Sequence, residues 1–150
     1  MKSIISKTMA LALTAIALFS FSPRPGGEGF EIFLNNKVVL QQYGSDMNTV
    51  KSLALAQSSI EDKLTIKYHH CGKVGKNRIV SIRDGQNKTL KEFHYADVST
   101  PVAGMVINVK DILSFKKGNR ILKLYYSSTE LPNGRVLATL QAGNAVAALP

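Results

Sequence analysis

The stretch LTIKYHHC, residues 64–71, carries the clearest fold signal in the chain. Its apolar residues Leu64, Ile66 and Tyr68 alternate with polar ones, and His70 continues the apolar side. Side chains of a β-strand alternate between its two faces with a period of two. The stretch therefore predicts a half-buried strand with one face toward a core and the other toward solvent.

Similar short alternating runs, separated by turn residues, continue across residues 30–141. No amphipathic helical period persists in this region. Many short strands with turn signals between them are typical of an all-β sandwich or barrel. We expect an all-β domain over residues 30–141: a single antiparallel β-sandwich, Ig-like or jelly-roll-like, of about eight or nine strands.

The first connection can be predicted in detail. A three-residue loop at positions 35–37, with Asn36 or Lys37 in the left-handed conformation, would place Ile32 opposite Leu40. All the large aliphatic side chains of the hairpin would then share one face. A two-residue loop would instead place Leu40 opposite Glu31, so the pattern favours a loop of three residues.

Two later connections are predicted from turn chemistry. The Asp-Gly step in residues 84–87 indicates a tight hairpin turn between two strands. Near the C-terminus, residues 122–126 are expected to pair with residues 136–140 across a loop that contains Pro132, Asn133 and Gly134.

The N-terminus has the layout of a secretory signal peptide, assigned here to residues 1–22. Two lysines precede an apolar run at residues 8–21, which fits a signal peptide and is shorter than the ~20 residues that span a bilayer. Removal of the signal leaves no transmembrane segment, a flexible leader at residues 23–29 and a loosely ordered tail at residues 142–150. We expect an exported protein in the periplasm, on the outer surface or in the medium, bacterial rather than eukaryotic.

The chain is strongly basic, with a formal net charge of +9 at pH 7. The expected signal contains Lys2 and Lys7, so the exported domain would carry +7. A charge of this sign attracts anionic partners and also keeps a small β domain soluble.

The positive charge is concentrated in one part of the sequence. Seven cations lie between positions 67 and 91 against one acid, Asp84. We interpret them as a basic surface that docks an anionic envelope component or another protein; the alternative is a solvated strand face that guards a sheet edge. The residues of this predicted surface are Lys67, Lys73, Lys76, Arg78, Arg83, Lys88 and Lys91.

The run Tyr68 to Cys71 offers an alternative, a metal or redox site. Strand geometry would place His69 and Cys71 on one face about 7 Å apart, and His94 or Met105 could complete a ligand set. Sulfur and imidazole ligands suit copper or zinc. Apart from this alternative, the residues imply no cofactor.

Motifs for catalysis or nucleic-acid binding are weak. Residues 72–75 match the GxxG loop that clamps RNA in KH domains, but alternating strand patterns flank the match and export separates the chain from cytoplasmic nucleic acid. The sequence has no nucleophile elbow and no HExxH motif. We therefore expect residues 72–75 to form a hairpin loop. We expect the protein as a whole to be a binding domain rather than an enzyme.

The signal, the run Gly29 to Ile32, Asn35 to Lys37, the turn Asp84 to Asn87 and the run Tyr125 to Ser128 together resemble small exported bacterial proteins of unknown function. The resemblance implies a β-sandwich and carries over no functional residue. A further possibility is a structural envelope subunit that pairs with a partner through an exposed strand edge.

Overall fold

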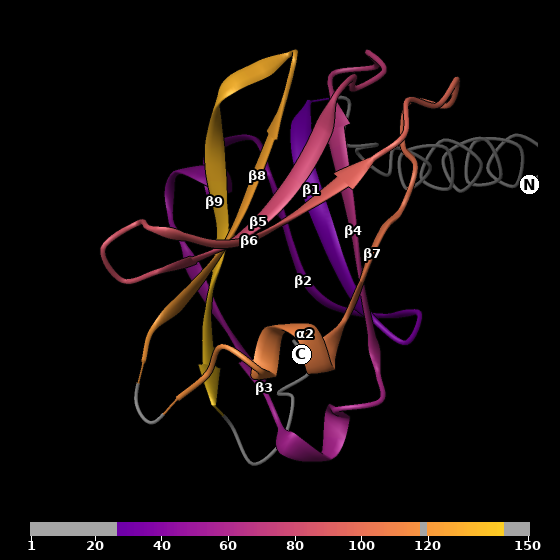
Figure 1. Cartoon of the computed structure of the whole chain (residues 1–150). Helices are drawn as coiled ribbons and strands as arrows, with labels where there is room; N and C mark the ends of the chain where they lie inside the picture. Colours follow the sequence, from indigo (N-terminus) through magenta and orange to yellow (C-terminus); the bar gives the residue numbers. More distant parts are fainter. Residues whose placement is uncertain (1–26, 118–119, 143–150) are drawn as a thin grey trace, which may run out of the picture.

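A computed structural model describes residues 27–117 and 120–142, which form two β-sheets and short helical segments (Figure 1). The described part of the chain is mostly strand, so the all-β class is confirmed. No helix among these residues is long and apolar enough to cross a membrane. The predicted signal at 1–22, the leader before Gly27 and the tail after Ala142 lie outside the described residues.

The first sheet has four strands in the order β2 (Lys37–Tyr43), β1 (Glu28–Leu34), β4 (Lys63–His70) and β7 (Met105–Asn108). The second has five, in the order β3 (Lys51–Leu55), β9 (Leu131–Ala142), β8 (Leu122–Ser128), β5 (Arg78–Asp84) and β6 (Thr89–Tyr95). Three short helical segments are η2 (Gly44–Asn48), η3 (Gln57–Ser59) and α2 (Val109–Leu113). Strand β1 starts at Glu28, inside the predicted leader.

One pairing departs from the antiparallel expectation. Strand β3 runs parallel to β9, from Lys51 opposite Ala138 to Leu55 opposite Ala142. Parallel neighbours need a long connection between them, and β3 and β9 are separated by five other strands in the chain. Local alternation cannot reveal the direction of such a distant partner.

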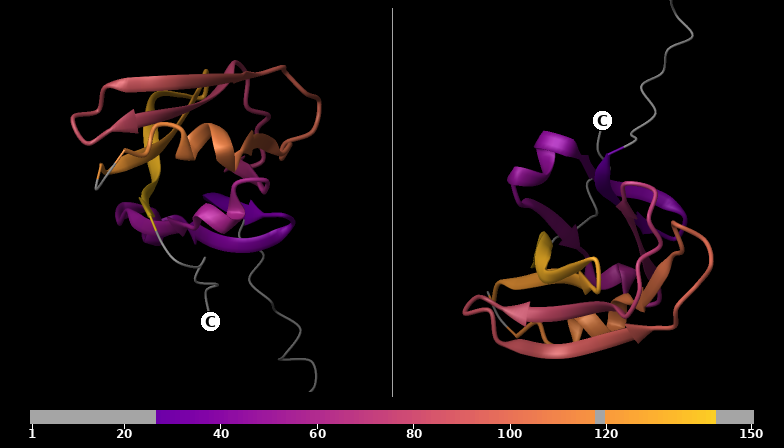
Figure 2. Two further views of the ribbon diagram at one scale, coloured as in Figure 1. Left: turned by 60° about the horizontal axis from the view of Figure 1, so that its bottom comes forward. Right: turned by 90° about the horizontal axis from the view of Figure 1, so that it is seen from above.

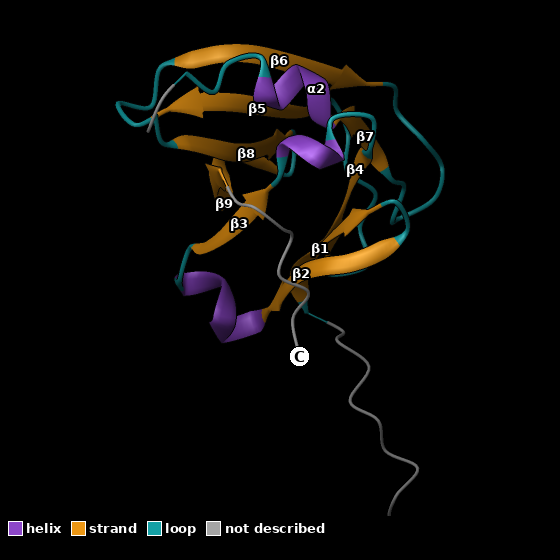
Figure 3. Ribbon diagram, turned by 90° about the horizontal axis from the view of Figure 1, so that it is seen from below, coloured by secondary structure: helices purple, strands orange, loops and turns teal. Residues whose placement is uncertain are grey.

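Both sheets contribute to one hydrophobic core. Ile66 of β4 and Val80 of β5 are completely buried, as is Tyr126 of β8. The apolar positions of the strands alternate with more exposed ones, as the pattern in β4 predicted. Figure 3 shows the two sheets from below, with α2 near β6 and β7 and with η2 connecting β2 to β3.

The β1–β2 hairpin keeps the predicted pair of Ile32 with Leu40, but it does so by a different route, and Val38 pairs with Phe33. Its loop has two residues, Asn35 and Asn36, both left-handed with φ of 46° and 69°. The register then shifts next to Ile32, so that Ile32 still pairs with Leu40. The three-residue loop was therefore wrong, because a β-bulge supplies the extra residue within the strand instead of in the turn.

The predicted loop before the last strand was also wrong. Pro132 and Gly134 lie inside β9, and the chain turns earlier, at Thr129 and Glu130. Gly134 has φ of 62°, and the register of β8 with β9 shifts in this region. Gly and Pro mark an irregular strand here rather than a loop.

Contacts at one open side tie the sheets together. The hydroxyl of Tyr95 in β6 donates to the carbonyl of Val106 in β7 at 2.9 Å. The ammonium of Lys91 in β6 donates to Asp111 of α2 at 3.2 Å. The β6 and β7 edges are thus partly occupied by contacts within the chain itself.

Candidate functional site

Arg78 does not lie on the surface where the sequence placed it. Its side chain is 6% exposed, and its terminal nitrogens donate to the carbonyls of Ala103 and Ala96. It shares strand parity with the core residues Val80 and Ile82, which was the available signal that it points inward. Arg78 therefore ties the connection between β6 and β7 to the core.

The other predicted basic residues do not form one surface. Lys67 belongs to the four-stranded sheet, where its ammonium lies 4.8 Å from the ring centroid of Phe33. Lys91 is paired with Asp111. Lys73 and Lys76 are exposed in the connection from β4 to β5. They lie near the start of β5, whereas Arg83 and Lys88 lie at its end.

A different set of cations gathers where β5 ends and β8 begins. Arg83 of β5 is directly opposite Lys123 of β8 in the sheet register. The turn after β5 and the start of β8 lie at this same end of the five-stranded sheet in both views of Figure 2. We call this surface the cationic end, and its members are Arg83, Lys88, Lys117, Arg120 and Lys123.

Arg83 is held in a fixed position by an aromatic ring. Its guanidinium carbon lies 3.5 Å from the ring centroid of Tyr125, and its Nε donates to Ser81. The Tyr125 hydroxyl donates to the carbonyl of Asn133, which anchors the ring. A guanidinium stacked on an aromatic face keeps its donor edge available. The arrangement presents a preorganised cation on the outer side of the sheet.

Lys123 is oriented by the β5–β6 turn. Its ammonium donates to Oδ1 of Asn87 at 2.8 Å and lies 3.5 Å from the carbonyl of Gly85. Asp84, the nearby acid, uses Oδ1 to accept the N–H groups of Gln86 and Lys88. Among the described residues, the ion pairs involve neither Arg83 nor Lys123.

The segment before β8 adds cations and an apolar side chain. Lys117 and Arg120 are exposed, and Ile121 is 53% exposed. Ile121 is two positions before Lys123 and directly precedes β8, which begins at Leu122. The sequence window that drew attention to Arg83 and Lys88 did not include these residues, because only the pairing of β5 with β8 brings them near.

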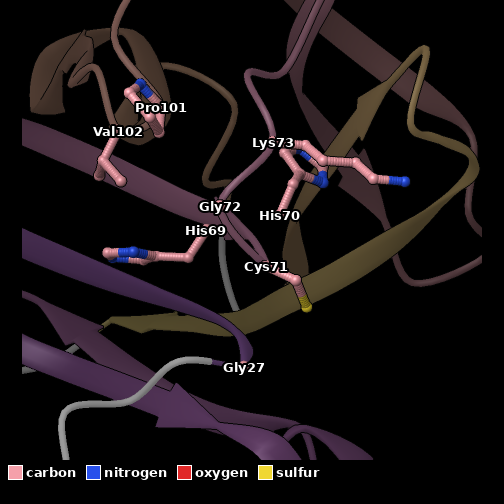
Figure 4. Close-up of a pocket in the computed structure, with 8 residues that line it drawn as sticks. All are labelled: Gly27, His69, His70, Cys71, Gly72, Lys73, Pro101 and Val102. Carbon is pink, nitrogen blue, oxygen red and sulfur yellow. The ribbon is translucent and has the colours of Figure 1, made fainter.

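A second feature is a cleft of about 290 Å³ at the other end of β5, lined by Gly27, His69, His70, Cys71, Gly72, Lys73, Pro101 and Val102 (Figure 4). His70 at its wall is 8% exposed. Nε2 of His70 lies 2.9 Å from the Tyr126 hydroxyl and 3.3 Å from that of Ser128. Burial lowers the pKa of His70, although Glu130 and Glu28 oppose the shift.

The predicted metal ligands do not converge. Strand β4 ends at His70, and Cys71 is left-handed with φ of 52°, so the alternation that would align it with His69 stops. Figure 4 shows the His69 ring and the Cys71 thiol pointing in different directions. His94 is in β6 beside Glu92, and Met105 is buried. Within the described ranges, no three His, Cys, Asp or Glu side chains are placed to hold a metal ion.

The chain matches no protein-family model and no curated protein sequence.

Proposed function

We propose that this protein is an exported, non-enzymatic binding module that docks an anionic envelope partner through its cationic end. The observation that carries the proposal is the direct opposition of Arg83 and Lys123 on neighbouring strands. Like charges at opposed positions destabilise a sheet. An anion bound between them would remove this repulsion, which gives the arrangement a use in binding.

The fixed geometry of the two cations supports the same proposal. Arg83 rests on Tyr125, and Lys123 is held by Asn87. Side chains that are already ordered lose less conformational entropy when a partner binds. Attraction to the remaining cations would be screened over about 8 Å at physiological salt, so binding should weaken as salt rises.

For the fold we propose a β-sandwich as the framework that presents this surface. Its support is the single hydrophobic core that the four-stranded and five-stranded sheets share. The export step rests on the predicted signal at residues 1–22.

The experiment is retention on immobilised heparin over a salt gradient. The double variant Arg83→Gln, Lys123→Gln should elute at clearly lower salt than the unmodified protein. The matched control is Lys73→Gln, Lys76→Gln, which removes the same charge from the opposite end of β5 and should elute close to the unmodified protein. Equal losses for both pairs would mean that net charge, and not this surface, controls binding, and would overturn the proposal.

A further inference from the structure

We infer that the partner of the cationic end is a membrane surface rich in anionic phospholipid headgroups. This inference rests on the proposed function and specifies the partner. It is carried by an apolar side chain placed among the cations. The relevant residues are Ile121 and its charged neighbours Arg120 and Lys123.

Ile121 is one of three large apolar residues that are about half exposed in the described part of the chain. The others are Val50, which precedes β3, and Val106 in β7. Ile121 alone of the three lies next to members of the cationic end in the chain: it follows Arg120 and precedes Lys123 by two positions. Single exposed apolar residues are ordinary on protein surfaces, so the surroundings of Ile121 are what distinguish it.

A lipid surface explains both kinds of side chain. Phosphate headgroups attract Lys and Arg, each worth about 1 kcal/mol near an anionic surface, while an apolar side chain can enter the boundary between headgroups and acyl chains. A soluble polyanion would use the cations but would gain little from Ile121. The combination therefore favours a lipid surface over a free anionic polymer.

The cationic end extends over two connections of the chain, which suits contact with a broad partner. The β5–β6 turn and the start of β8 lie at one end of the five-stranded sheet (Figure 2), and they belong to two separate connections. Cations are present on both: Lys88 on the turn, and Lys117 and Arg120 on the segment before β8. A bilayer offers phosphates at many positions, so it can meet cations on both connections at once.

The first test uses the absence of tryptophan from the chain. An Ile121→Trp variant introduces a single indole, whose fluorescence is measured with vesicles of phosphatidylcholine alone and of phosphatidylcholine mixed with phosphatidylglycerol. We expect a blue shift with the anionic vesicles and none with the neutral ones. The control Val106→Trp places the indole on β7 in the other sheet and should show no shift with either.

The second test separates this inference from the proposed function. Ile121→Ser should weaken binding to the anionic vesicles about three- to tenfold, as loss of a partly buried aliphatic group implies, and should leave binding to soluble polyphosphate unchanged. Val106→Ser should change neither. The lipid inference fails if Ile121→Ser leaves vesicle binding intact. It also fails if Ile121→Trp shows no fluorescence shift although the protein still binds polyphosphate. In both cases the proposed function stands. If Arg83→Gln, Lys123→Gln binds both as well as the unmodified protein, the proposed function fails.

Discussion

Nε2 of His70 lies 2.9 Å from the hydroxyl of Tyr126, and this contact connects the last residue of β4 to the middle of β8 in the other sheet. The two rings also pack at 5.7 Å between centroids, and Tyr68 stacks on Tyr126 at 4.4 Å. Gly75 covers the pair so closely that an added Cβ would lie 3.1 Å from both His70 and the Tyr126 hydroxyl. A polar contact is thus enclosed at the end of the core.

Replacing Tyr126 by Phe should measure what this contact contributes. The change keeps the ring and removes the hydroxyl, which leaves the hydroxyl of Ser128 at 3.3 Å as the remaining neighbour of Nε2. We expect the free energy of unfolding to fall by about 1–2 kcal/mol, the usual cost of removing one partner from a buried hydrogen bond. Urea denaturation followed by circular dichroism gives the value.

The adjacent tyrosine supplies the control for this measurement. Tyr125 has the opposite strand parity and is partly exposed, and its hydroxyl donates to the carbonyl of Asn133. Tyr125→Phe should cost less, because water can replace its partner. Equal costs for the two tyrosines would show that burial of the His70 contact adds nothing.

The buried His70 should make stability depend on pH in the mildly acidic range. Burial lowers its pKa in the folded protein, whereas the unfolded chain takes up a proton near pH 6.5. Below about pH 6.5 the unfolded state therefore binds more protons, and the free energy of unfolding falls by at most about 1.4 kcal/mol per pH unit until the folded pKa is reached. Urea midpoints between pH 7.5 and 5.5 test the slope.

A His70→Gln variant should flatten this slope even if its overall stability is lower. Glu130 does not confuse the measurement. Burial by itself would raise the pKa of Glu130, but hydrogen bonds from the Lys76 N–H, from its own N–H and from Ser128 lower this pKa below its ordinary value. Its contribution is present above its ordinary value of about 4.5 and is lost at lower pH. An unchanged slope in His70→Gln would contradict the assignment, and an NMR titration of the His70 ring provides an independent check.

The first hairpin shows how far the sequence could predict the fold. Alternation correctly placed Ile32 opposite Leu40, because burial of aliphatic side chains selects the face of each strand. It could not show that the extra residue lies in a bulge, which buries Val39 beside Leu40 and leaves Val38 half-buried, because strict alternation assigns two consecutive residues to opposite faces. Two consecutive Asn residues are the local signal for a two-residue turn with positive φ.

The candidate site was predictable only in part, for a different reason. Arg83 and Lys88 stood out as members of a local charge run, but Lys123 joins them through the pairing of β5 with β8, forty residues later in the chain. The same charge run included Arg78, whose parity with Val80 turns it into the core. Charge density along the sequence does not distinguish inward from outward positions of a strand, whereas parity does.

Two substitutions in the β1–β2 turn should separate backbone strain from side-chain bonding. Asn35 and Asn36 both have positive φ, which glycine adopts without strain. Of these two residues, Asn35 alone makes side-chain hydrogen bonds in the described structure. Its side chain donates to Asp62 at 2.6 Å and accepts the Lys63 N–H at 3.0 Å. Asn36→Gly should leave stability nearly unchanged, whereas Asn35→Gly should cost about 1 kcal/mol.

Thermal or urea unfolding of these two variants gives the comparison directly. A third variant, Asn36→Ala, should cost about 1 kcal/mol, because alanine lacks the tolerance of asparagine for the left-handed region. If Asn35→Gly is as stable as Asn36→Gly, the bonds to Asp62 and Lys63 do not fix the loop.

Gly134 connects stability to the proposed binding surface. Its φ is +62°, and a Cβ built there would overlap the ring of Tyr125, on which Arg83 rests. Gly134→Ala should therefore lower the free energy of unfolding by at least about 1 kcal/mol through backbone strain alone. It should also displace Tyr125 and, with it, the guanidinium of Arg83, so that elution from heparin shifts to lower salt although no charge is removed.

The control is Gly85→Ala, where an added Cβ meets no atom within 4 Å. This variant should change neither the free energy of unfolding nor the elution from heparin. A destabilised Gly134→Ala that keeps its heparin elution would show that the Tyr125 ring does not position Arg83 for binding.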